Sequence, residues 1–245
     1  QMLSNKTKFR INTYNAGYPS TDLIHSTNRL VSVILPLRPK FIVLMLSIND
    51  FMLLSRNKDY WGDKEEPKVI TLQIQQNPVL DFLSLSKLRK FINEFKNGKK
   101  TNTTNQIKTD TTLIYSNYSN ALKTFISVCK DWHIKPILVT QPMLLESSDL
   151  WKAINENGKI NFSQKEFIII QNRMNIILEE VALSNGIKFM DLSKKLISQK
   201  NNFENYFRLS KKGTEEAASI ISDSISYWLN DSTIITKPNE NLTIH

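Results

Sequence analysis

Residues 40–50 read Lys-Phe-Ile-Val-Leu-Met-Leu-Ser-Ile-Asn-Asp, an apolar run that ends in short polar side chains. The run contains β-branched residues and follows Pro39, and it is shorter than a typical helix. This pattern predicts a strand that is buried on both faces. The run is also far shorter than the ~20 residues of a membrane-spanning helix. A doubly buried strand is typical of a parallel sheet with helices on both sides.

The alternation of short apolar runs and longer helical patterns continues along the whole chain. We expect further strands at 10–15, 135–140 and 187–190, and helices at about 22–35, 111–132, 163–184 and 210–228. Strand and helix in repetition indicate an α/β fold, with helices on both faces of a parallel sheet. Such folds bind ligands beyond the carboxyl ends of their strands.

Composition excludes several classes of protein. The 245 residues carry a net charge of +9, but Lys and Arg are scattered among Asn, so we expect no nucleic-acid interface. The single Cys excludes an internal disulfide and a cysteine-rich zinc site. We also expect no metal and no cofactor.

A membrane span and a signal peptide are not visible in the sequence. Because the chain begins with Gln1, an extracytoplasmic or membrane-anchored location through preceding residues stays open.

The domain organisation follows from a change in composition. We expect one domain over residues 1–230, with a polar, Asn/Thr/Lys-rich insertion at about 55–110. Residues 231–245 form a polar C-terminal tail in this interpretation. Tyr60 and Trp61 are among the few apolar anchors near the start of the insertion.

Three short motifs stand next to the predicted strands and the last helix. They are Asn-Ala-Gly at 15–17, Ser-Ile-Asn-Asp at 47–50 and Leu-Ser-Lys-Lys-Gly at 209–213. Each motif alone is explained by the needs of a turn. Taken together and in this order, they resemble the SGNH hydrolases, also called GDSL esterases and lipases. The resemblance spans nearly the whole chain and is closest to bacterial, polysaccharide-associated members, in which a Tyr-Trp pair follows the Asn-Asp motif.

The resemblance implies a fold, a chemistry and a set of residues. The fold is a flavodoxin-like three-layer α/β/α sandwich with strand order 2-1-3-4-5. The chemistry is hydrolysis of an acyl or acetyl ester, frequently on an acetylated polysaccharide, so the expected ligand is an acyl ester or an acetylated carbohydrate. The tetrahedral intermediate of that reaction needs fixed hydrogen-bond donors for its oxyanion. By position these donors are Gly17 and Asn49, with Asn15, Ser47 and Asp50 in supporting places.

Two functional blocks of that family are not intact in this chain. The family's Asp-x-x-His falls on Asn205 and Arg208, and neither side chain can serve as a general base or as its carboxylate partner. Glu204 stands one residue out of register. The serine block is absent, because only fourteen residues precede Asn15. We therefore expect the first strand to be missing from this chain, which implies either further residues upstream in nature or a rearranged fold.

Replacements for the missing groups are few. His25, His133 and His245 are the only histidines, and each is more simply a surface or helix-end residue. Ser20 and Ser47 are the serines nearest the site, where an N-cap and a turn explain them. Two hypotheses follow: an ester hydrolase that is impaired or inactive as given, and a non-catalytic relative that binds an acylated glycan or a protein partner.

Overall fold

The computed structural model describes residues 11–18, 21–45, 48–61, 111–148, 150–152, 154, 162–196, 200–205 and 207–230. Contacts divide the chain into two units, residues 1–60 with 109–245 and residues 61–108. Apart from Trp61, every described residue belongs to the first unit. Most of the expected insertion and the whole C-terminal tail lie outside the described residues, so those boundaries stay predictions.

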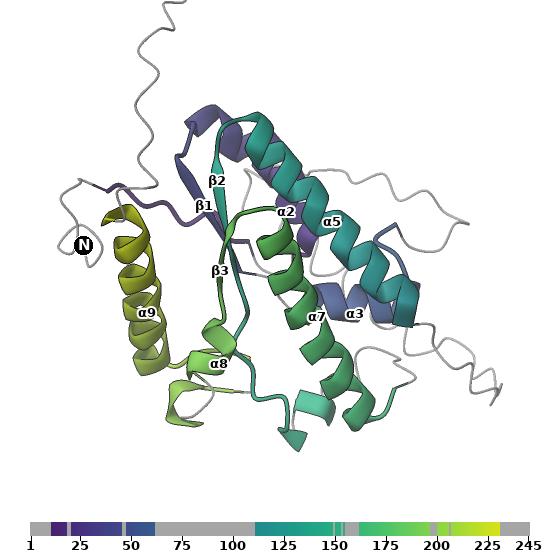
Figure 1. Ribbon diagram of the computed structural model, residues 1–245. Coiled ribbons are helices and arrows are strands. Elements are labelled where there is room, and N and C mark those ends of the chain that lie inside the picture. Colours follow the sequence, from purple (N-terminus) through teal and green to yellow (C-terminus); the bar gives the residue numbers. More distant parts are fainter. Residues whose placement is uncertain are drawn as a thin grey trace, which may run out of the picture. The chain divides into compact units, whose positions relative to one another are not determined.

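The centre of the first unit is a parallel sheet (Figure 1). Its described strands are β1 (Phe41–Met45), β2 (Lys135–Val139) and β3 (Lys188–Met190), in the order β1-β2-β3. Phe41 lies opposite Lys135, and Ile137 lies opposite Lys188. These strands confirm three of the four that the sequence predicts.

Helices cover the sheet on both faces, as Figure 1 shows. On one face α2 (Leu23–Arg29), α5 (Thr111–Asp131) and α7 (Gln164–Ser184) share a core with Leu44 and Leu138 of the sheet. On the other face α9 (Lys211–Asn230) packs against Ile137, Val139 and Met190. The expected three-layer α/β/α architecture is thereby confirmed.

Shorter helices complete the unit. The helix α2 continues as a π-helical turn, η1 (Leu30–Ile34), and a 3₁₀ turn, η2 (Leu35–Leu37). After β1 comes α3 (Ile48–Asn57), and β3 is followed by α8 (Leu192–Leu196) and η3 (Lys200–Asn202). The sequence analysis missed α3, although Phe51 and Leu54 lie one turn apart and are both fully buried. As a result, residues 55–57 of the expected insertion belong to this helix.

Two sequence-based expectations for the sheet are wrong. Residues 11–15 form no strand, because the described residues place no strand beside them with which they could pair. The strand β1 is not buried on both faces, since Val43 and Met45 are 42% and 39% exposed. Both side chains share a face with Phe41. Phe41 packs against the core between the sheet and α9, whereas Val43 and Met45 are not part of that core.

The start of α7 shows how local sequence sets these elements. Ser163 accepts a hydrogen bond from the Glu166 backbone N–H, and the Glu166 carboxylate accepts one from the Ser163 N–H at 2.8 Å. This reciprocal pair satisfies two backbone donors that a helix N-terminus leaves open. The carboxylate's hydrogen bonds with the Ser163 N–H and hydroxyl also lower the pKa of Glu166.

Replacing Ser163 with alanine is expected to destabilise the fold by about 1 kcal/mol, because the cap on the Glu166 N–H is lost. Urea denaturation followed by circular dichroism would measure the change. Ser163→Asp, which can still cap, should retain most of the wild-type stability. An alanine variant as stable as the wild type would contradict the role of the cap.

Candidate functional site

The carboxyl ends of β1 and β2 are joined by a side-chain contact. Gln141, directly after β2, accepts a hydrogen bond from the Ile48 backbone N–H at 2.9 Å through its Oε1 atom. Ile48 is the first residue of α3, so the amide of Gln141 caps this helix. The start of α3, with Ile48, Asn49 and Asp50, is therefore held at the end of the sheet where open parallel sheets bind ligands. Ser47 itself lies outside the described residues.

Asn49 is fixed at the junction between α3 and α2. Its Nδ2 atom donates to the backbone carbonyl of Thr21, one residue before the N-cap of α2, at 3.0 Å. The Asn49 residue is half-buried. The hydrogen bond orients the amide group at the place where the sequence analysis expects an oxyanion donor.

Gly17, the other expected donor, has its N–H engaged within its own turn. The Gly17 N–H donates to Asn15 Oδ1 at 3.0 Å, and both residues are exposed. Arg29 Nε donates to the carbonyl of Ala16 at 2.9 Å, which ties the turn to the end of α2. An oxyanion could receive the Gly17 N–H only after Asn15 releases it.

Asp50, the residue after Asn49, links α3 to α2. Only 1% of Asp50 is exposed, and its Oδ1 atom accepts from the Leu23 N–H at 2.8 Å and from the Tyr60 hydroxyl at 3.0 Å. Its Oδ2 atom has no hydrogen-bond partner among the described residues. Burial, with a smaller contribution from the nearby Asp22 carboxylate, raises the pKa of Asp50 to about 7, although the hydrogen bonds from Leu23 and Tyr60 act to lower it. The same environment raises the pKa of Tyr60. Asp50 and Tyr60 therefore hold the junction together, whereas Trp61 is 69% exposed.

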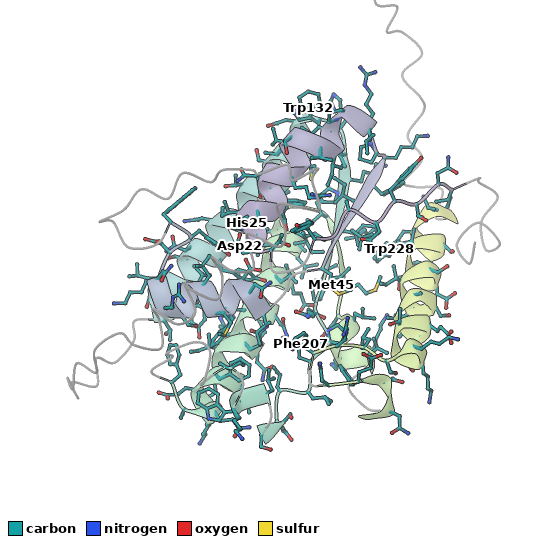
Figure 2. All side chains as sticks on the ribbon, turned by 180° about the vertical axis from the view of Figure 1, so that it is seen from behind. Asp22, His25, Met45, Trp132, Phe207 and Trp228 are labelled. Atoms are coloured by element: carbon teal, nitrogen blue, oxygen red, sulfur yellow. The ribbon has the colours of Figure 1, made fainter. Side chains whose placement is uncertain are left out.

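An Asp–His pair that the sequence analysis did not recognise lies on the first turn of α2. Asp22 Oδ2 lies 2.8 Å from His25 Nδ1, and Asp22 Oδ1 accepts from the His25 backbone N–H at 2.9 Å. Figure 2 shows both residues from behind. The sequence predicted an N-cap at Ser20 and a surface or helix-end position for His25, whereas the N-cap of α2 is Asp22. The spacing Asp-x-x-His was the signal that could have identified the pair.

Asn205 and Arg208 belong to a turn before α9. Asn205 Oδ1 accepts from the N–H groups of Phe207, at 3.1 Å, and Arg208, at 2.8 Å. The Arg208 side chain is 73% exposed, and its Nε atom lies 3.8 Å from a carboxylate oxygen of Glu204, whose side chain is 55% exposed. Phe207 lies apart from Asp22 and His25 in Figure 2. These contacts give the pair a structural use, which is to shape the turn.

The end of β3 also builds structure. Asp191 Oδ1 accepts from the Thr140 hydroxyl at 2.9 Å and from the Lys194 N–H at 3.0 Å. Thr140 Oγ1 in turn accepts from the Ser193 N–H at 2.9 Å. Both side chains thus cap α8, in agreement with the turn-forming interpretation of the strand ends.

A surface depression of about 560 Å³ lies elsewhere, between α7, β3, α8 and α9. No residue of the predicted site lines it; the lining residues include Glu179, Phe189, Asp191, Tyr227 and Trp228.

Among the described residues, no group of three or more His, Cys, Asp and Glu is arranged to hold a metal ion. Within the same part of the chain, no helix is long and apolar enough to cross a membrane.

Comparison with known proteins finds similar solved structures only. No family model and no curated protein matches the chain. The structure of a protein described as an acylhydrolase, from Bacteroides fragilis, is 15% identical, with a TM-score of 0.49 over 86% of this chain and 73% of the other. The structure of an acetyl xylan esterase is 16% identical, with a TM-score of 0.44 over 90% of this chain and 79% of the other. A catalytic mutant of an acetylxylan esterase from Geobacillus stearothermophilus is 10% identical, with a TM-score of 0.45 over 86% and 70%.

Proposed function

We propose that this chain carries an acyl-ester site at the carboxyl end of β1, and that its ligand is an acetylated carbohydrate. The observation that carries the proposal is the Asn49 amide, which Thr21 holds at the junction of α2 and α3. The order of the motifs along the sequence and the parallel sheet that positions them support it. No cofactor is needed for this chemistry.

The proposed role of Asn49 is electrostatic. When water or another nucleophile adds to an ester carbonyl, negative charge develops on the carbonyl oxygen. An amide N–H that is already oriented stabilises this charge without first having to reorganise.

A second candidate is a relative that binds an acylated glycan or a protein partner without turning it over. The turn at 203–209 favours it, because Asn205 and Arg208 stand where the resemblance requires an Asp and a His. Arginine keeps its proton at neutral pH and cannot accept one. If the chain is a hydrolase, we therefore expect a slow one. The rate of ester hydrolysis above the buffer rate distinguishes the two candidate functions.

Replacing Asn49 with alanine is expected to lower the rate of p-nitrophenyl acetate hydrolysis about 100-fold, the usual effect of losing one oxyanion donor. The assay uses the full chain and monitors release of p-nitrophenolate. Asn117→Ala is the matched control, because Asn117 Nδ2 also donates to a backbone carbonyl, that of Lys58, at 2.8 Å.

The two variants separate a chemical role of Asn49 from a structural one. Both lose an amide-to-carbonyl hydrogen bond and should lose similar stability, about 1 kcal/mol. Only Asn49→Ala should lose activity. Equal rates in Asn49→Ala and the wild type would refute the site. Binding of an acetylated oligosaccharide without hydrolysis would favour the second candidate.

A further inference from the structure

We propose that the outer edge of β3 binds an extended peptide segment of another protein, one that carries a lysine or arginine side chain. The binding site is the depression between α7, β3, α8 and α9. This inference is independent of the acyl-ester site, because none of the residues proposed for that site lines the depression.

The depression lies at the edge of the sheet. Its lining includes Glu179 of α7 and Trp228 of α9. These helices pack on opposite faces of the sheet, and Figure 1 shows them on either side of β3. Because the sheet separates its two faces, a single depression that reaches both helices has to pass along the outer edge of β3. Phe189 and Met190 of β3 line it accordingly.

The backbone of β3 offers hydrogen-bonding groups at this edge. In the described part of the chain, β2 is the one strand that pairs with β3. The Met190 carbonyl accepts from the Thr140 N–H at 3.1 Å, so the backbone groups of Met190 are directed toward β2. Successive residues of a strand direct these groups to opposite sides, and those of Phe189 therefore face away from β2. An extended peptide can pair with them as an added strand.

The walls of the depression are acidic, although the chain as a whole has a net charge of +9. The charged lining side chains are three carboxylates and one ammonium group, those of Glu179, Asp191, Asp223 and Lys195. Asp191 uses one oxygen to cap α8, whereas Glu179 and Asp223 are exposed on the two helices that flank β3. A positively charged side chain of the peptide complements this arrangement.

Aromatic rings on α9 favour the same kind of side chain. Lys188 Nζ lies 5.7 Å from the centroid of the Trp228 ring, so this wall already holds one ammonium group of the chain itself. The face of an aromatic ring attracts a cation through the quadrupole of the ring. The neighbouring Tyr227 also lines the depression and is 72% exposed. Its ring offers a second such face to a lysine or arginine of the peptide.

The strand pairing is tested on the full chain with a synthetic probe, the N-acetylated and C-amidated pentapeptide Thr-Val-Lys-Val-Thr, whose residues favour an extended strand. Backbone hydrogen exchange is followed by NMR. We expect the Phe189 N–H to exchange about tenfold more slowly once the peptide fills about nine-tenths of the sites. The Met190 N–H should exchange slowly with and without peptide. A Phe189 N–H that is already slow in the free chain, or that the peptide leaves unchanged, would overturn the proposal.

The charge complementarity is tested with Glu179→Gln. We expect the dissociation constant of the peptide to rise about threefold, as for the loss of one exposed ion pair. Glu180→Gln is the matched control, because Glu180 follows on the same helix but pairs with Arg173 and does not line the depression. It should bind the peptide like the wild type. Equally tight binding of the same peptide with glutamate in place of its lysine would contradict the assignment.

The aromatic contact is tested with Tyr227→Ala, which should also weaken peptide binding about threefold. Trp132→Ala is the control, since Trp132 is 60% exposed and lies apart from Trp228 in Figure 2. Both replaced side chains are exposed, so circular dichroism should show a folded protein in each case. If an oligosaccharide bound at the depression and neither peptide did, the surface would be a glycan site and the proposal would be wrong.

Discussion

Gly213→Ala is expected to prevent stable folding or to destabilise the protein by more than 4 kcal/mol. A Cβ atom at position 213 would lie 2.0 Å from the backbone oxygen of Asn202 and 2.8 Å from its carbonyl carbon. These are backbone atoms, so no side-chain rotation can relieve the clash. The Gly213 N–H also donates to Ser210 Oγ, and the Ser210 N–H donates to Asn202 O. The substitution would therefore push α9 away from η3 and disturb the core between α9 and the sheet.

Gly186→Ala provides the matched control. Gly186 ends α7 with a φ of +66°, and an added Cβ would meet no atom within 4 Å. Its substitution introduces backbone strain without a clash, and about 1 kcal/mol of destabilisation is expected. Urea denaturation of both variants would measure the difference. If Gly213→Ala were as stable as Gly186→Ala, the close approach of α9 to η3 would be wrong.

The second large effect is a pH dependence of stability that originates at Asp50. Burial raises the pKa of Asp50 from 3.8 to about 7 in the folded protein. Between these values the folded state retains a proton that the unfolded state releases, so stability falls as the pH rises from about 4 to 7. The full difference corresponds to roughly 4 kcal/mol. Below pH 4 both states hold the proton and the effect disappears.

Asp50→Asn isolates this contribution, because asparagine cannot ionise and its Oδ1 can still accept from Leu23 and Tyr60. The variant should match the wild type near pH 4 and exceed its stability at pH 8. Asp50→Ala should be less stable than Asp50→Asn at both pH values, since it leaves two buried donors without an acceptor. Identical pH profiles for the wild type and Asp50→Asn would contradict the assignment. Thermal unfolding from pH 4 to 8 measures all three.

Periodicity was sufficient to predict most of the fold. The helical spacing of apolar residues over 163–184 and the short apolar runs at 40–46 and 135–140 correspond to α7, β1 and β2, because each pattern fits one period only. The segment 10–15 shows the alternation of apolar and polar residues that is typical of a strand, but its described residues, 11–15, form no strand. Strand formation depends on a neighbour for hydrogen bonding, and a local pattern does not contain that information.

The contacts of the candidate site were only partly predictable from the sequence. Ile48 begins α3 after β1, and Asn49 and Asp50 both reach the start of α2, while their roles in a site stay predictions. That Asp50 would accept from Tyr60 could not be inferred, since the two are separated by a helix whose direction depends on packing. The Asp22–His25 contact was not predicted, because a surface or helix-end position explained His25 from local sequence alone.

The most direct test of the acyl-ester site is the NMR signal of the Asn49 side-chain NH₂ group in the full chain. It would be followed during titration with an acetylated oligosaccharide and, separately, with the same oligosaccharide after chemical deacetylation. We predict that the acetylated ligand shifts the Asn49 signal and leaves that of Asn117 in place, and that the deacetylated ligand shifts neither. An Asn49 signal that is unmoved by the acetylated ligand, or moved equally by both, would contradict the site.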